Sequence, residues 1–80
     1  MKKFFVYILQ CSDLSNYTGC TSDLDHRIRK HNKGLIISTR FRIPVELITC
    51  ISFSDKYKAF AFEKYLKSGS GRAFMKRHLI

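Results

Sequence analysis

The sequence predicts a small α+β fold, because three segments have the pattern of strands and three have the pattern of helices. Residues 4–9 form an uninterrupted apolar run, FFVYIL, and residues 45–53 largely alternate between apolar and polar side chains. An unbroken apolar run is typical of a strand covered on both faces, whereas alternation is typical of a half-buried strand. We therefore expect the first strand to be central and residues 1–80 to form a single domain.

The charge of the chain indicates a polyanionic partner. Fifteen Lys and Arg residues against six Asp and Glu residues give a formal net charge of +9. In so small a chain this favours nucleic acid as the partner, with an anionic membrane surface as the second candidate. No apolar run approaches the roughly 18 residues of a membrane span, so we expect a soluble, cytoplasmic protein. Three cysteines without CxxC spacing favour neither a disulfide framework nor a zinc site.

A polar turn at residues 11–16 separates the apolar first strand from a second strand that contains Tyr17 and Gly19. Tyr7 places a phenol in the middle of the first strand, where a buried hydroxyl needs a hydrogen-bond partner. Two tyrosines on adjacent strands suggest a functional site, although aromatic side chains in strands also serve as ordinary core residues. Gly19 leaves the backbone bare beside them.

Residues 21–34 have the start and stop signals of a helix. Ser22 is a candidate N-cap with acidic residues in the first turn, and basic residues precede Gly34. Arg27 and His31 are four residues apart, so they share one face of this helix and can act together. Alternatively, Arg27 is a solvated charge, and His31 is a surface residue that complements the helix dipole.

The connection at residues 35–44 carries hydroxyl groups and two arginines that bracket an aromatic residue. Such a composition suits phosphate contacts and base stacking. Thr39, Arg40 and Arg42, together with the bare backbone at Gly19, are therefore the candidate nucleic-acid contacts.

Three further elements complete the chain. The strand at residues 45–53 is expected to place four apolar side chains on one face: Val45, Leu47, Ile51 and Phe53. A helix capped by Ser54 should run to about Lys67, and a short basic helix capped by Ser70 should cover residues 72–80.

Glu63 is the acidic residue whose neighbours suggest an inward position. It lies among Phe60, Phe62 and Leu66, which we expect on the inner side of the helix, and an unpaired carboxylate there would be costly. The alternative is an ordinary surface glutamate.

The residues resemble those of a known family. The relevant segments, in order, are Val6-Tyr7-Ile8-Leu9, Tyr17-Thr18-Gly19, Leu24-Asp25-His26-Arg27 with His31-Asn32, Thr39-Arg40 before Pro44-Val45, and Ala59 four residues before Glu63. Together they are similar to the GIY-YIG nuclease domain of the small standalone bacterial type. The resemblance implies a three-stranded antiparallel sheet packed against about three helices, and hydrolysis of DNA phosphodiester bonds.

The resemblance also implies roles for five residues. Tyr7 and Tyr17 match tyrosines near the scissile phosphate, and Arg27 matches an arginine that stabilises the phosphoryl transition state. Glu63 matches the ligand of a single divalent cation, Mg²⁺ or Mn²⁺, and His31 a position that also reaches the site in some members. A metal, an arginine and a phenol or imidazole suit phosphodiester hydrolysis.

The chain departs from the family pattern at two places. No asparagine follows Glu63, and Cys20 lies where some members have a lysine. Three functions therefore stay open: a metal-dependent DNA endonuclease, a nucleic-acid-binding module with weak or no cleavage, and a purely structural or protein-interaction role. With no second domain to choose a target, specificity is expected to be low or to come from a protein partner.

Overall fold

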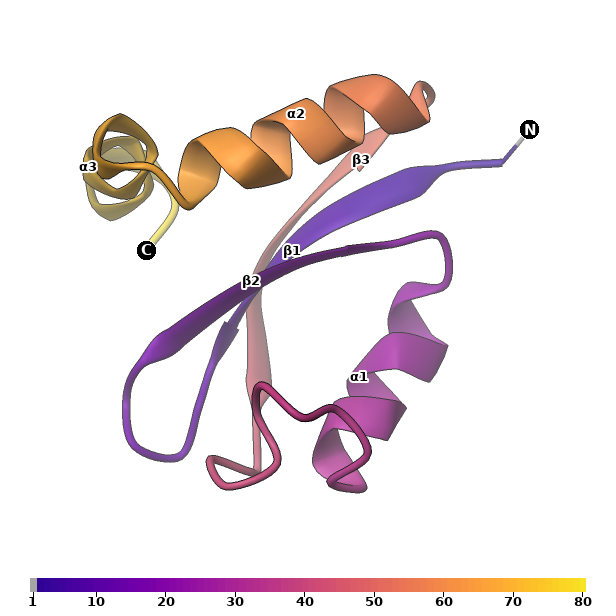
Figure 1. Ribbon diagram of the computed structural model, residues 1–80, viewed down its shortest axis with the longest axis vertical. Helices are drawn as coiled ribbons and strands as arrows, with labels where there is room; N and C mark the ends of the chain where they lie inside the picture. Colours follow the sequence, from indigo (N-terminus) through magenta and orange to yellow (C-terminus); the bar gives the residue numbers. More distant parts are fainter. Residues whose placement is uncertain (1) are drawn as a thin grey trace.

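A three-stranded antiparallel sheet forms the centre of the molecule (Figure 1). The computed structural model describes residues 2–80. In chain order the elements are β1 (Phe4–Gln10), β2 (Asn16–Thr21), α1 (Leu24–Asn32), β3 (Glu46–Phe53), α2 (Lys56–Leu66) and α3 (Gly69–His78). The strand order β2-β1-β3 confirms the prediction that the first strand is central, and the α+β class is confirmed as well.

Both faces of β1 are covered, which explains its unbroken apolar sequence. Val6 and Ile8 pack on one face against α2 and α3, in a cluster with Ala59, Leu66 and Met75. Tyr7 and Leu9 point to the other face, where Leu24 and Ile28 of α1 pack against their cluster. Figure 1 shows the helices on opposite sides of the sheet accordingly.

A bulge in β3 corrects the prediction that its four apolar residues share one face. Ile8 pairs with Thr49 but Leu9 pairs with Leu47, so one extra residue is inserted between them. Val45 consequently belongs to the cluster on the α1 face, whereas Phe53 packs on the α2 face. The extra residue reverses the side-chain alternation along the strand.

The caps of all three helices differ from the predicted ones. Asp23 caps α1 in place of Ser22, Asp55 caps α2 in place of Ser54, and Ser68 caps α3 in place of Ser70. Each helix has two cap-competent residues within two positions, and the chain path decides between them. Because Ser68 is the cap, α3 begins at Gly69, shortly after α2 ends at Leu66.

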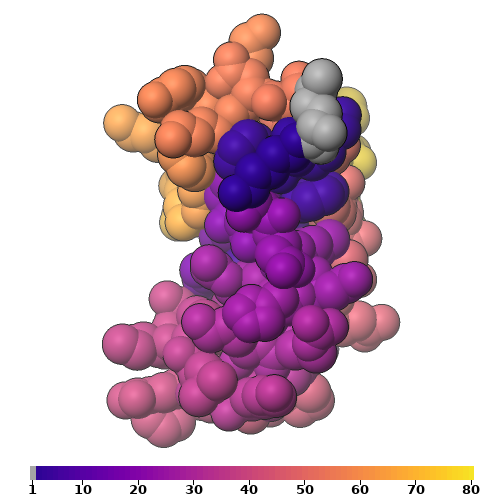
Figure 2. All heavy atoms as spheres, turned by 90° about the vertical axis from the view of Figure 1, so that its right-hand side faces the viewer, coloured from indigo at the N-terminus to yellow at the C-terminus, as the bar shows by residue number. Residues whose placement is uncertain are grey.

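Large apolar side chains are exposed on α2 and in the connection between α1 and β3, among other places. Phe60, which we expected on the inner side of α2, is 49% exposed, because Ala59, Phe62 and Leu66 take the face toward the sheet. The connection between α1 and β3 forms the end of the molecule remote from α2 (Figure 2, pink). Among residues 2–80, no helix is long and apolar enough to cross a membrane.

Candidate active site

Tyr7 lies across the neighbouring strand, and Gly19 makes this position possible. The two residues face each other in the β1–β2 register, and the Tyr7 side chain is fully buried. A Cβ atom on residue 19 would lie 2.5 Å from Cζ of Tyr7, well inside van der Waals contact, and closer still to the hydroxyl oxygen. The glycine is therefore required by the ring of Tyr7, and no ligand is needed to explain it.

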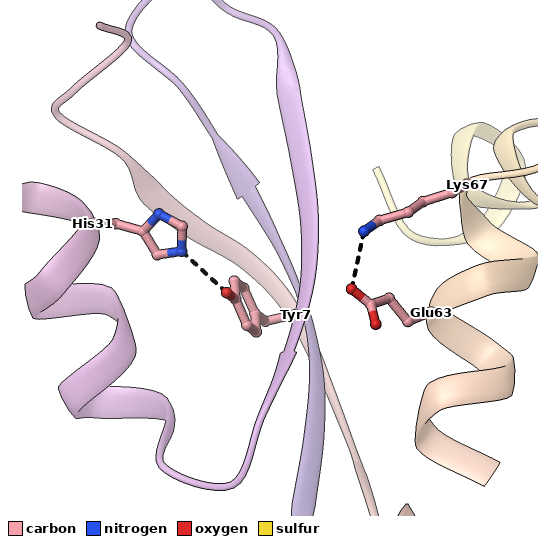
Figure 3. Close-up of polar contacts among 4 residues, drawn as sticks. All are labelled: Tyr7, His31, Glu63 and Lys67. Atoms are coloured by element: carbon pink, nitrogen blue, oxygen red, sulfur yellow. Dashed lines mark hydrogen bonds and ion pairs between the residues drawn. The ribbon is translucent and has the colours of Figure 1, made fainter. Parts of the chain in front are cut away.

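A buried chain of hydrogen bonds extends from the Tyr7 hydroxyl through α1 to the following loop. The hydroxyl is 3.0 Å from Nε2 of His31 (Figure 3). On the other side of the ring, Nδ1 of His31 is 2.6 Å from Oγ1 of Thr39. Both His31 and Thr39 are fully buried. Thr39 thus fixes the orientation of the imidazole, and the phenol has the partner that its burial requires.

Tyr17 completes an aromatic group with Tyr7 and His31. Its ring centroid lies 6.4 Å from that of Tyr7 and 5.3 Å from that of His31, at tilted and edge-on angles. These are favourable distances for aromatic pairs. The two tyrosines of the hairpin and the histidine of α1 therefore meet at one place, on the side of the sheet that faces α1.

Burial determines the charge state of this group. It raises the pKa of Tyr7 to about 12, helped by the nearby Tyr17, while the positive charge of Arg27 acts in the opposite direction. Burial, and then Arg27, lower the pKa of His31 below its usual value. At neutral pH the phenol is therefore protonated and the imidazole is neutral, so Nε2 of His31 is able to accept a hydrogen bond from the Tyr7 hydroxyl.

Arg27 lies on α1, one turn before His31, and is partly buried. Its charge influences the pKa of Tyr7, of His31 and of the Cys20 thiol on β2. Arg27 is thus within electrostatic range of the phenol and of the β2 edge. Arg29, two residues further along the same helix, is exposed.

Glu63 approaches the same part of β2 from α2. Its charge raises the pKa of Cys20 and of Tyr7, which places it within electrostatic range of the residues that Arg27 also influences. The side chain is 23% exposed, and Oε2 accepts a hydrogen bond from Nζ of Lys67 at 3.0 Å (Figure 3). Lys67 in turn lies 5.9 Å from the ring centroid of Tyr17.

One carboxylate is a suitable ligand for a hard divalent cation that keeps most of its shell as water and phosphate oxygens, as Mg²⁺ does. Within residues 2–80 no group of three His, Cys, Asp or Glu side chains is arranged to hold a metal. The donor set therefore fits a cation held jointly by protein and substrate. Lys67 pairs with Oε2 of Glu63 in an exposed i, i+4 ion pair, which is a weak competitor for a cation.

The predicted nucleic-acid contacts separate into two groups. Arg40 lies over the ring of Phe41, which is 87% exposed, at 4.8 Å from its centroid, so this pair is available to a partner. Arg42 instead donates hydrogen bonds to Oγ of Ser15 and to the Ser38 carbonyl, and it ties the loop to the β1–β2 turn. Thr39 and Gly19 are both buried, Thr39 beneath His31 and Gly19 beneath the Tyr7 ring.

Sequence reasoning did not identify Lys67 as part of the site, nor Thr39 as the partner of His31. The i, i+4 spacing of Glu63 and Lys67 is a readable signal for an ion pair on a helix. The Thr39 contact has no local signal, because it depends on how the loop returns beneath α1.

Comparison with known proteins identifies the family. The model of the GIY-YIG catalytic domain matches residues 3–77. The UPF0213 protein YsiG of Lactococcus lactis is 41% identical over 68 residues, which are 84% of this chain and 65% of that protein's own length. The UPF0213 protein YazA of Bacillus subtilis is 45% identical over 64 residues, 79% of this chain and 65% of that protein. This chain thus spans about two thirds of the length of these curated relatives.

A solved structure agrees with this result. The solution NMR structure of the UPF0213 protein BH0048 from Bacillus halodurans is similar with a TM-score of 0.60 and 39% identity, covering 94% of this chain and 81% of that one. The resemblance seen in the sequence motifs is therefore confirmed. The family model, the relatives and the shared fold together show that this chain belongs to the GIY-YIG catalytic domain family.

Proposed function

We propose that this chain is a metal-dependent endonuclease that hydrolyses DNA phosphodiester bonds. Membership of the GIY-YIG family suggests nuclease activity. The observation that carries the proposal is the buried chain from Tyr7 through His31 to Thr39, with Arg27 and Glu63 both close enough to influence the phenol. An arginine of α1 and a glutamate of α2 thus lie within electrostatic range of one buried tyrosine, as a phosphoryl-transfer site requires.

The hydrogen-bonded chain fixes the orientation of the Tyr7 hydroxyl. In the tautomer that carries its hydrogen on Nδ1, His31 donates to Thr39 and accepts from the Tyr7 hydroxyl at Nε2. A phenol with a pKa of about 12 does not lose its proton unaided at neutral pH. Because burial also lowers the pKa of His31, the proton stays on Tyr7, and the hydroxyl, held in place by its hydrogen bond to His31, would orient the attacking water.

Arg27 supplies positive charge at the α1 side of the site. A guanidinium group near the scissile phosphate stabilises the charge that develops on the phosphoryl oxygens, and it does so more strongly in a partly buried position than in water. The charge of Arg27 also keeps His31 neutral, so the imidazole stays an acceptor for the Tyr7 hydroxyl.

Glu63 would hold the divalent cation, which when bound polarises a phosphoryl oxygen. For this the cation either binds through Oε1 or exchanges with Lys67 at Oε2. An incoming phosphate offers Lys67 another anionic partner, so substrate binding itself would favour the exchange. Lys67 also supplies a cation beside Tyr17, in a chain that has Cys20 where some members carry a lysine.

The loop between α1 and β3 is the proposed DNA contact outside the site. Arg40 and the exposed ring of Phe41 form a cation–π pair that offers a charge to phosphate and a face to a base. The net charge of +9 supports a polyanionic partner in general.

A nucleic-acid-binding module without turnover is the second candidate, and the Glu63–Lys67 ion pair favours it. If Lys67 keeps Glu63 occupied when DNA is bound, the chain binds DNA but does not cut it. The two functions therefore differ only in cleavage.

A cleavage assay on a panel of labelled single-stranded, duplex, nicked and branched DNA tests the proposal. With Mg²⁺ or Mn²⁺ we expect cleavage of at least one substrate, and with chelator none. Arg27→Ala should reduce the rate by about 10²-fold or more, comparable to the loss of one transition-state donor. Arg29→Ala removes the same charge from the same helix at an exposed position and should have little effect.

Binding without cleavage across the whole panel would select the binding module. Equal losses from Arg27→Ala and Arg29→Ala would show that overall charge, and not the position of Arg27, governs the reaction.

A further inference from the structure

A cavity of about 410 Å³ lies between the start of β2 and the junction of α2 with α3. Ligand sites in proteins typically have volumes of about 300 to 1,000 Å³, so this cavity is of a size for a small ligand. It is continuous with the candidate active site, because Tyr17 and Lys67 line the cavity and also contact the site.

The polar part of the cavity wall is strongly cationic. Lys67, Arg72 and Lys76 line it, and no acidic side chain does. Within residues 2–80 the salt bridge of Lys67 with Glu63 is the one ion pair closer than 4 Å, so neither Arg72 nor Lys76 is neutralised by a described carboxylate. Three cations from two helices around one hollow favour an anionic ligand, and phosphate in particular.

The rest of the wall is apolar and aromatic. Leu66 and Met75 are buried core residues whose surfaces form part of the lining, and the ring of Tyr17 forms another part. A free inorganic phosphate would leave this apolar surface uncovered, whereas a base or sugar would cover it. The cavity therefore combines the two features that a nucleotide needs.

We propose that this cavity binds one nucleotide of the DNA strand that is cut, next to the scissile phosphate. The proposal rests on the proposed nuclease function. Arg72 and Lys76 hold the phosphate of this nucleotide, and Tyr17 with Leu66 and Met75 receives its base or sugar. Because Tyr17 contacts both Tyr7 and His31, a nucleotide held there fixes the position of the neighbouring phosphate relative to the site.

A titration that needs no cleavage tests the assignment. Deoxyadenosine 5′-monophosphate, deoxyadenosine and inorganic phosphate are added separately to the protein without metal, and the NMR signals of the Leu66 and Met75 methyl groups and of the Tyr17 amide are followed. The nucleotide should shift these signals in a saturable way. The nucleoside and the inorganic phosphate should each bind about tenfold more weakly, since each lacks one half of the interaction.

Matched double variants test the charges. Arg72→Ala/Lys76→Ala should weaken nucleotide binding about tenfold or more. Lys64→Ala/Arg77→Ala removes the same two charges from exposed positions of α2 and α3 that do not line the cavity, and it should change binding by no more than about twofold. All four side chains are exposed, so both variants should keep the wild-type melting temperature.

The assignment is overturned if the nucleotide shifts signals only elsewhere, such as in the loop at Phe41, or if both double variants lose affinity equally. Inorganic phosphate binding as tightly as the nucleotide would also overturn it. If the protein binds the nucleotide here but cuts no DNA, the nucleotide site stands and the proposed nuclease function fails. If the protein cuts DNA but does not bind the nucleotide here, only the assignment of the cavity fails.

Discussion

Substitution of Gly19 is the sharpest structural test of how the site is built. In Gly19→Ala the new methyl group would overlap the Tyr7 ring, with Cζ at 2.5 Å. Overpacking of this kind costs about 1 to 3 kcal/mol, and losing the Tyr7–His31 hydrogen bond adds about 1 kcal/mol. Alanine regains up to about 1 kcal/mol, because glycine loses more conformational entropy in a strand. The net destabilisation is therefore about 1 to 4 kcal/mol.

Gly69→Ala is the matched control. A Cβ atom on Gly69 meets nothing within 4 Å, and this residue begins α3, so the substitution should be neutral or stabilise by up to about 1 kcal/mol. Urea unfolding of both variants measures the difference. In Gly19→Ala the Tyr7 ring should also move away from His31, and the NMR signals of the imidazole should change. Equal stability of the two variants, with an unchanged imidazole, would refute the explanation given for Gly19.

Three further predictions follow from charge and pKa. Because the pKa of Tyr7 is raised from 10.0 to about 12, the stability that its protonated form contributes is complete below pH 10 and is lost toward pH 12. In urea unfolding over this range, the free energy of unfolding of wild type should fall by about 2 to 3 kcal/mol more than that of Tyr7→Phe. The pKa of His31 is lowered, so the stability that its neutral form contributes is lost as the pH falls below 6.5. The free energy of unfolding of His31→Gln should therefore depend less on pH in this range. DNA affinity, measured by fluorescence anisotropy, should fall steeply between about 50 and 200 mM salt, and Arg40→Ala should make this fall less steep. An affinity that does not change with salt would contradict the proposed phosphate contacts.

The sequence predicted the type and order of the elements well because each has a strong local signal. The apolar run of β1 and the cap-and-stop signals of α1 are local properties of the chain. The caps themselves were displaced, since adjacent residues such as Ser22 and Asp23 are chemically equivalent as caps and the choice depends on the tertiary path. The bulge in β3 is a property of its pairing with β1 and could not be read from β3 alone.

The candidate site was predictable only in part. Tyr7 was expected to need a hydrogen-bond partner, and His31 was named as a site residue, but the contact between them joins residues 24 positions apart. Thr39 was predicted to be a nucleic-acid contact in the loop, but it is fully buried. Its burial follows from its hydrogen bond to His31, in a loop whose path is not encoded by periodicity.

Glu63→Gln provides the most direct test of the central claim that this site cleaves DNA with a divalent cation. The substitution keeps the shape of the side chain and removes the charge that would bind the cation. Glu46→Gln, at an exposed position on β3, is the control with the same change of charge. Cleavage and DNA affinity are measured for wild type and both variants, with Mg²⁺ and with chelator. We predict that Glu63→Gln abolishes metal-dependent cleavage while DNA binding is unchanged or tighter, because repulsion of phosphate is removed, and that Glu46→Gln cuts as wild type does. Cleavage that persists in chelator, or that survives in Glu63→Gln, would contradict the account.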